Sequence, residues 1–122
     1  MDAATLLTGF AEVLDSHDWD ALPALLHPDF TCTYAHTGEV FDRNQFVRVN
    51  ADYPGFQRFT VEDLVADGPR AVVRGRVTAT APDGSEQVFA VASFATVEDG
   101  RITELTEVWT DVDQKPREGA RQ

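Results

Sequence analysis

The chain has few of the residues that would cross-link it or place it in a membrane. Its one cysteine, Cys32, cannot form an internal disulfide. No apolar run approaches the about 20 residues that a membrane-spanning helix needs. The first five residues, Met-Asp-Ala-Ala-Thr, lack the basic start of a secretory signal. We therefore expect a soluble, cytoplasmic protein that does not contact a membrane.

Basic residues are also scarce. The 10 lysines and arginines are outnumbered by 21 acidic residues, which gives a formal net charge of −11. A protein that binds nucleic acid needs a basic face that displaces counterions from the phosphates, so this composition excludes a nucleic-acid partner. We interpret the acidity as a source of solubility.

Close groups of metal or phosphate ligands are missing. The three histidines, His17, His27 and His36, are nine or ten residues apart on different expected elements, which is not the spacing of a zinc site. A glycine-rich phosphate loop and a Ser-His-Asp motif are also absent from the sequence. The sequence therefore predicts no metal site and no cofactor.

The residues that are present predict one folded domain. A chain of 122 residues with 43% hydrophobic residues, eight phenylalanines and two tryptophans has enough apolar material for a core and a small cavity. We assign residues 1–113 to this domain. Residues 114–122 are polar, and we expect them to form a disordered tail.

Three helices are expected near the N-terminus. A first helix is predicted from about residue 3 to residue 17, and a short second one has Pro23 in its first turn, with Asp18 or Asp20 as its cap. A third helix opens at Asp42, where Asp42-Arg43-Asn44-Gln45 has the form of a capping box. The first helix is predicted from apolar residues at spacings of three and four: Leu6, Leu7, Phe10, Val13 and Leu14.

Strands follow the helices. Residues 30–35 alternate in polarity, and four more strands are predicted over residues 56–66, 70–81, 86–97 and 101–112. The short turns between the last four, Asp-Gly-Pro, Pro-Asp-Gly-Ser and Glu-Asp-Gly, require antiparallel pairing. The order predicts an α+β fold in which a curved, mainly antiparallel sheet wraps three N-terminal helices and leaves a cavity.

Two segments carry a resemblance to a known family. Residues 17–41 change from helical to alternating periodicity at His27-Pro28-Asp29-Phe30, and the last strand reads Asp-Gly-Arg-Ile-Thr-Glu-Leu-Thr-Glu-Val-Trp-Thr-Asp from residue 99. Together they resemble the SnoaL-like branch of the nuclear transport factor 2-like superfamily, over roughly residues 3–112. The resemblance implies a cone-shaped domain around one apolar pocket. It also implies a homodimer, because relatives pair through the outer face of the sheet.

Alternation divides the last strand into two faces without saying which one is buried. Resemblance to ketosteroid isomerase implies that Leu105, Glu107 and Trp109 face the ligand. The alternative is that Glu107 meets solvent or a structural ion pair. On the strand over 86–97 we expect Val88, Ala90, Ala92 and Phe94 inside. We expect the dimer face to carry Val72, Arg74, Arg76, Phe89 and Val91.

Two activities of relatives are disfavoured by this sequence. Tyr34, Phe10 and Ala92 stand where ketosteroid isomerase has its base and its two oxyanion donors, so that reaction is excluded. Tyr34, His36 and Glu107 are similar to part of the limonene epoxide hydrolase site. The remaining arginine and aspartate are missing from residues 86–97, which makes epoxide hydrolysis a less favoured activity.

Resemblance to the SnoaL-like cyclases implies cofactor-independent acid/base chemistry, such as cyclisation, isomerisation or dehydration, on a small and mostly apolar organic molecule. Glu107, or less favourably Asp111, would be the acid, His36 a second proton carrier and Tyr34 a hydrogen-bond donor. Against this role, a single histidine after a strand is more often a loop residue or a satisfied polar cap. The rival interpretation is a non-catalytic ligand-binding or dimerisation module. The predicted lining is Phe10, Leu14, Trp19, Tyr34, Phe46, Tyr53, Phe94, Leu105 and Trp109.

Overall fold

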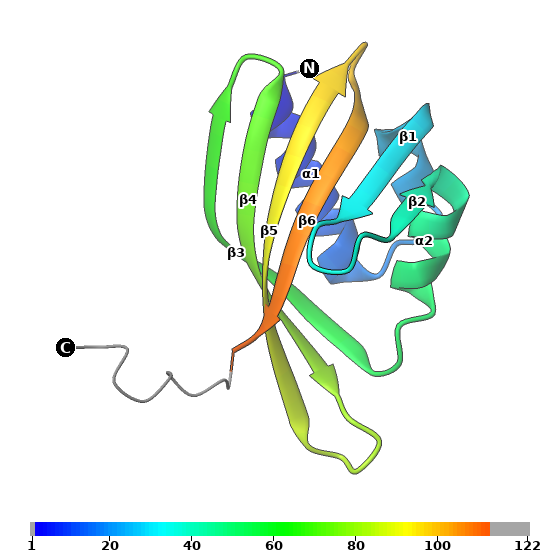
Figure 1. Ribbon diagram of the computed structural model, residues 1–122, viewed down its shortest axis with the longest axis vertical. Helices are drawn as coiled ribbons and strands as arrows, with labels where there is room; N and C mark the ends of the chain where they lie inside the picture. Colours follow the sequence, from blue (N-terminus) through cyan, green and yellow to red (C-terminus); the bar gives the residue numbers. More distant parts are fainter. Residues whose placement is uncertain (1, 113–122) are drawn as a thin grey trace, which may run out of the picture.

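An amphipathic helix, α1 (Ala3–Ser16), covers one face of the sheet in the computed structural model, which describes residues 2–112 (Figure 1). The Asp2 carboxylate caps the helix by accepting a hydrogen bond from the Thr5 N–H at 2.8 Å. The helix ends at His17, whose left-handed backbone (φ 59°) closes the last turn. Its buried face carries Ala3, Leu6, Leu7, Phe10, Ala11 and Leu14.

The expected second helix is a single 3-10 turn, η1 (Leu22–Leu25), so residues 2–112 contain two α-helices and not three. The proline at its start has no N–H to lose there. Strand β1 (Leu26–Tyr34) follows at once and begins four residues earlier than predicted. The short strand β2 (Val40–Asp42), which pairs with β1, was not predicted from the sequence.

Helix α2 (Arg43–Ala51) confirms the predicted capping box. The Gln45 N–H donates to Asp42 Oδ1 at 2.8 Å, and the Asp42 N–H donates to Gln45 Oε1 at 2.9 Å. Beyond the helix, Gly55 has a φ of 73°, and a Cβ at this position would overlap the carbonyl oxygen of Thr80. Glycine therefore allows the end of α2 to pass close to the sheet.

Six strands form one sheet in the order β2-β1-β6-β5-β4-β3. The last four are β3 (Phe56–Asp67), β4 (Arg70–Thr80), β5 (Glu86–Glu98) and β6 (Arg101–Asp111), and they pair antiparallel as predicted. Strand β1 lies beside β6 and runs parallel to it, which no turn in the sequence indicated. The α+β fold with a curved, mainly antiparallel sheet is confirmed.

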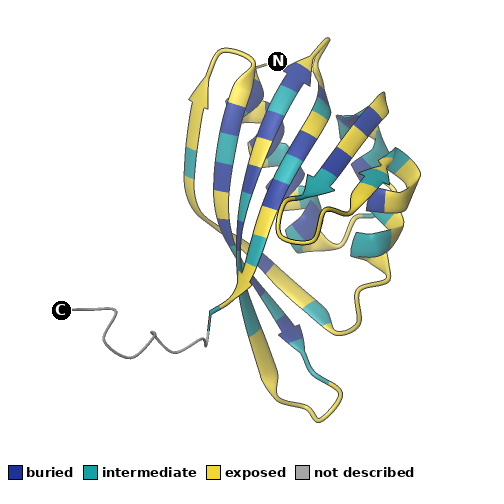
Figure 2. Ribbon diagram, in the orientation of Figure 1, coloured by how far each residue is buried: buried dark blue, intermediate teal, exposed yellow. Residues whose placement is uncertain are grey.

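The core lies between the helices and the inner face of the sheet. Buried and exposed residues alternate along β4, β5 and β6, whereas the edge strand β3 is mostly exposed (Figure 2). Shifts in the pairing of β3 with β4 around Glu62 turn this acid to the outer face. There its carboxylate pairs with Arg74 at 2.9 Å and with Arg76 at 3.2 Å.

The two faces of β5 are the reverse of the prediction. Val91, Ser93 and Ala95 point into the core, while Phe94 lies on the outer face with 39% of its surface exposed. The expected positions of Phe94 inside and of Val91 outside are therefore wrong. The error has a physical cause: both faces of this strand are apolar, so alternation of hydrophobicity does not distinguish them.

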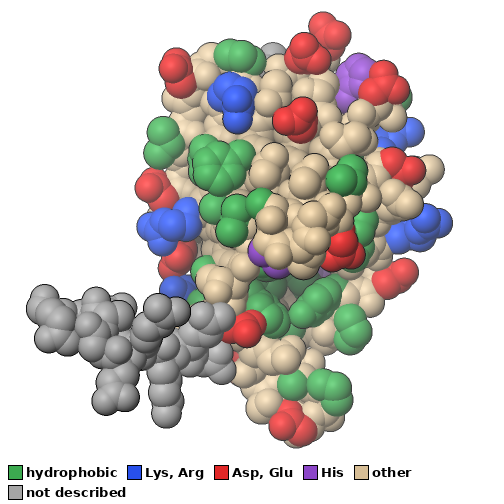
Figure 3. Space-filling view, in the orientation of Figure 1, with side chains coloured by type: hydrophobic (Ala, Val, Ile, Leu, Met, Phe, Trp, Pro, Cys, Tyr) green, Lys and Arg blue, Asp and Glu red, His purple; other side chains and the backbone are tan. Residues whose placement is uncertain are grey.

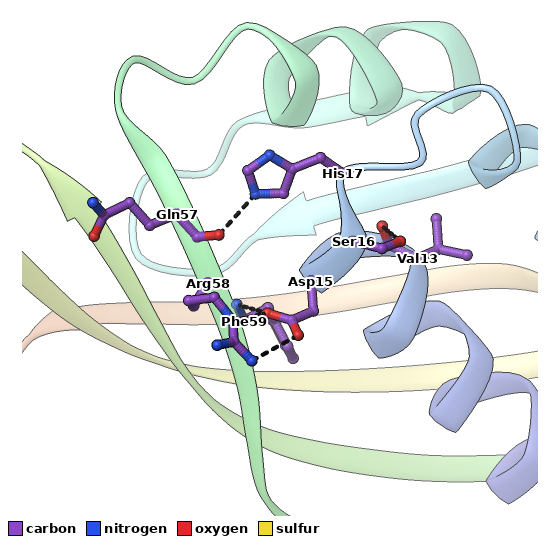
Figure 4. Close-up of polar contacts among 7 residues, drawn as sticks. All are labelled: Val13, Asp15, Ser16, His17, Gln57, Arg58 and Phe59. Carbon is purple, nitrogen blue, oxygen red and sulfur yellow. Dashed lines mark hydrogen bonds and ion pairs between the residues drawn. The ribbon is translucent and has the colours of Figure 1, made fainter.

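Polar contacts tie the end of α1 to the start of β3 (Figure 4). The Asp15 carboxylate accepts hydrogen bonds from Arg58 Nε at 2.7 Å and Nη2 at 3.0 Å, and from the Phe59 N–H at 2.9 Å. His17 Nε2 donates to the Gln57 carbonyl at 2.8 Å. Hydrogen bonds from the Arg58 guanidinium hold the pKa of Asp15 below its usual range.

None of the helices in residues 2–112 is long and apolar enough to cross a membrane. The tail predicted over residues 114–122 lies outside the described residues.

We expect Asp15→Asn to lower the free energy of unfolding by about 1 kcal/mol at neutral pH, because the ion pair is half exposed and contributes modestly. The Asp15 pKa is depressed in the folded protein, so the loss should be full above about pH 5 and should shrink as pH falls through the folded pKa. Urea unfolding at several pH values measures it. Asp18→Asn, an exposed change of equal charge nearby, is the control, and equal effects of both would contradict the role of Asp15.

Candidate functional site

A cavity of about 430 Å³ opens between the end of α2, the end of β1 and the strands β4 to β6. Figure 3 shows a hollow rimmed by hydrophobic side chains in the lower half of the view. Most of the wall is aromatic or aliphatic, with a few polar groups at one side. The lining residues are Tyr34, His36, Val49, Asn50, Tyr53, Phe56, Val77, Phe89, Trp109, Thr110 and Asp111.

The parallel pairing of β1 with β6 builds one wall. Tyr34 is the register partner of Glu107, and the Ala35 N–H donates to the Glu107 carbonyl at 2.9 Å. The Tyr34 ring stacks on His36 with centroids 5.4 Å apart and lies 6.4 Å from the Trp109 ring. Three aromatic side chains from the ends of two neighbouring strands thus lie against the same space.

Helix α2 and strand β5 contribute further lining residues. Asn50 donates from Nδ2 to the Phe46 carbonyl at 2.8 Å, which fixes its side chain along the helix. Tyr53, just beyond the helix, meets the Phe89 ring edge to face at 6.4 Å. The tight passage at Gly55 sets the position of Tyr53 relative to the sheet.

Glu107 is buried directly behind this lining, with 3% of its surface exposed. Its Oε2 accepts a hydrogen bond from Ser93 Oγ at 2.6 Å, and its Oε1 accepts one from Trp109 Nε1 at 3.3 Å. None of the ion pairs formed within residues 2–112 includes it. Burial raises the pKa of Glu107 above its usual range, and the two hydrogen bonds offset only part of that effect. The side chain therefore retains its proton more readily than an exposed glutamate does.

Two neighbours of Glu107 also resist ionisation. Burial, reinforced by the negative charge of an ionised Glu107, raises the pKa of the Tyr34 phenol and of the Cys32 thiol. Tyr34 remains a hydrogen-bond donor at any ordinary pH. Cys32 is fully buried and packs as a small hydrophobic residue.

The structure brings four of the predicted site residues to the cavity, namely Tyr34, His36, Tyr53 and Trp109. Glu107 does not line the cavity, but it contacts this group by accepting a hydrogen bond from Trp109 Nε1. The inner face of β6 is thus the one that carries Leu105, Glu107 and Trp109, and an irregularity near Thr103 turns Ile102 inward as well.

Six other predicted lining residues lie elsewhere. Phe10, Leu14, Phe46 and Leu105 are buried in the core and do not line the cavity, because α1 and the body of α2 pack tightly on the sheet. Trp19 does not line the cavity. Its ring stacks on His17 and meets the ring of Phe56 edge to face. Phe94 lies on the outer face of the sheet.

Several lining residues were not predicted from the sequence. Phe89 and Asn50 are the most informative omissions, because one required the correct face of β5 and the other the point at which α2 ends. Asp111 was named only as a less favoured acid, although alternation from Trp109 places it on the same face. The full set of omissions is Val49, Asn50, Phe56, Val77, Phe89, Thr110 and Asp111.

Comparisons with a family model and with solved structures agree on one family. A family model described as the SnoaL-like domain matches residues 7–105. A candidate ketosteroid isomerase from Kribbella flavida is 28% identical, with a TM-score of 0.81 over 93% of this chain and 82% of that one. An LEH-like epoxide hydrolase from M. tuberculosis is 19% identical, with a TM-score of 0.74 over 88% and 82%.

A candidate SnoaL-like polyketide cyclase from Shewanella putrefaciens is 13% identical, with a TM-score of 0.73 over 86% of this chain and 87% of that one. Likeness at such low identity shows the shared fold. A comparison with curated protein sequences gave no match. Within residues 2–112, histidine, cysteine and acidic side chains form no group that could hold a metal ion.

We expect Glu107→Gln to change how stability depends on pH. The Glu107 pKa is raised in the folded protein, so its stabilising contribution is complete below the unfolded value, near 4.3, and is lost as pH rises through the folded value. Wild type should lose stability relative to the glutamine variant by up to about 1.4 kcal/mol per pH unit in that window. Urea unfolding between about pH 5 and pH 9 measures this difference. Glu104→Gln, an exposed change on the same strand, is the control, and parallel curves for wild type and Glu107→Gln would contradict the raised pKa.

Proposed function

The chain belongs to the SnoaL-like domain family, and we propose that its cavity binds a small, mostly apolar organic molecule. We propose further that side chains at the cavity remove a proton from this molecule and return one to it, without a cofactor. The observation that carries the proposal is the meeting of Tyr34, His36 and Trp109 at one wall of the cavity, with the buried acid Glu107 directly behind.

The size and lining of the cavity support the binding part of the proposal. Small-molecule sites are usually concave, with volumes of about 300 to 1,000 Å³, and are lined by apolar and aromatic side chains with a few polar groups. This cavity has about 430 Å³ and such a lining. An organic molecule with one ring or a short chain fits this space.

The polar groups support the catalytic part. His36 presents an imidazole ring, a group whose nitrogens can accept and donate a proton. Tyr34, whose pKa is raised, remains protonated and can donate a hydrogen bond to an oxygen that gains negative charge. His36 and Tyr34 line the same wall with stacked rings, so both can reach one bound molecule.

In the proposal, Glu107 is a second group that can exchange a proton, in addition to His36. Its carboxyl stands behind Trp109 rather than in the wall, and both of its oxygens already accept hydrogen bonds. This arrangement also favours the rival function, a binding module in which Glu107 only fixes the position of the indole. Comparison of Glu107→Gln with wild type in the exchange assay below distinguishes the two roles of Glu107.

We expect the protein to accelerate exchange of the protons next to the carbonyl group of small cyclic ketones, measured by NMR in deuterated water. Tyr34→Phe and His36→Gln should each slow the enzymatic exchange by roughly two to four orders of magnitude while ketone binding is retained. His27→Gln, a histidine outside the cavity, is the matched control. Ketones that bind without accelerated exchange would support the binding module, and ketones that do not bind would contradict the proposal.

We also propose that two copies of the chain pair through the outer face of the sheet. Exposed apolar side chains lie there on neighbouring strands, and hydrophobic patches are visible on this face in Figure 3. Val65, Val72 and Phe94 form one row across β3, β4 and β5, with Val108 on β6 beside them. Such a surface is typical of an interaction site, and a self-complementary patch is typical of a twofold dimer.

Phe94→Lys should convert the dimer to a monomer, because it places a charge in the centre of the apolar row. Sedimentation velocity at micromolar concentration measures the change. Val61→Lys, an equally exposed position on β3 outside the row, should leave the dimer intact. A wild-type protein that remains monomeric on concentration would contradict the pairing.

A further inference from the structure

We propose that the molecule bound in this cavity carries a positively charged nitrogen, as an alkylated ammonium compound does. This inference rests on the proposed function only in using the same cavity. It adds a chemical class that an apolar lining does not by itself specify.

Aromatic rings surround the cavity at steep angles to one another. The Tyr34 and Trp109 rings are inclined by 58°, and the Tyr53 and Phe89 rings by 85°. Phe89 and Trp109 come from neighbouring strands of the sheet and Tyr53 from the segment after α2, so these rings reach the cavity from different elements. The face of an aromatic ring attracts cations, and several such faces around one site are typical of proteins that bind quaternary ammonium groups.

Charge at the cavity favours a cation as well. Among the described residues that line it, none is lysine or arginine, and the carboxylate present is that of Asp111. The chain as a whole has a net charge of −11. A cationic ligand therefore finds an attractive field and one direct partner, whereas an anionic ligand finds only His36 as a possible positive partner.

The contact between Trp109 and Glu107 strengthens the argument. Trp109 Nε1, the one polar atom of the indole, donates to Glu107 Oε1 at 3.3 Å. This donor is thereby engaged by a residue that does not line the cavity. Donation to a carboxyl oxygen leaves more electron density on the ring, which increases its attraction for a cation.

A matched pair of ligands tests the inference. Choline and its neutral analogue, in which a quaternary carbon replaces the nitrogen, have nearly the same shape and differ in charge. Affinities measured by NMR titration at low salt should favour choline by at least about tenfold, since several ring faces and one carboxylate act together. Higher salt should narrow this difference, because ions screen the attraction of Asp111.

Two variants locate the effect within the cavity. Asp111→Asn and Tyr53→Leu should each weaken choline binding by about two- to fivefold and leave the neutral analogue almost unaffected. Both side chains are exposed at the rim, so neither change removes core packing, and circular dichroism verifies the fold. Asp63→Asn, an exposed change of equal charge on β3, is the control and should leave choline binding unchanged.

The outcomes separate this inference from the proposed function. Equal binding of both compounds would overturn the cationic ligand and leave a site for apolar molecules. Binding of neither would also overturn it, whereas the proposed function is decided by the neutral ketones. An equal loss of choline binding in Asp63→Asn and Asp111→Asn would overturn the role of Asp111. It would show that choline responds to the net charge of the protein and not to a carboxylate in the cavity.

Discussion

The parallel pairing of β1 with β6 is the constraint on which the site depends. It places Tyr34, the last residue of β1, next to Glu107 on β6, and the hydrogen bond from the Ala35 N–H to the Glu107 carbonyl extends that register by one residue. The segment between β1 and α2 then turns back as β2, which brings the end of α2 over the same space. Without this pairing, Tyr34 and His36 would not meet Trp109 at all.

Glu107 shows how the same pairing creates an unusual chemical environment. A carboxyl group in the core costs free energy when it ionises, and two hydrogen bonds from Ser93 and Trp109 recover only part of that cost. Among the described residues, the buried polar ones are Glu107 and its hydrogen-bond partner Ser93. The cost of burying a carboxyl group is therefore confined to the region beside the cavity. Perturbed acids of this kind are frequent at functional sites, and the position of Glu107 beneath the lining is consistent with that pattern.

Local sequence signals predicted local structure well. Apolar spacing predicted α1, the sequence Asp42-Arg43-Asn44-Gln45 predicted the capping box of α2, and three short turns predicted the antiparallel strands. Each of these features depends on residues a few positions apart, so the sequence is sufficient. The resemblance to the SnoaL-like family supplied the inner face of β6, which alternation alone left open.

The sequence by itself determined α1, the capped start of α2, the antiparallel pairing of the last four strands, the acidic character and the residue types available for a site. Tertiary structure decided which of those residues meet. It reversed the faces of β5, because an exposed apolar surface on the outer side makes Phe94 and Val91 equivalent in a sequence pattern. It also moved Phe10 and Phe46 into the core and brought Phe89, Asn50 and Asp111 to the cavity. The physical reason is that a cavity is formed by elements distant in sequence, and its walls depend on where those elements stop and how closely they pack.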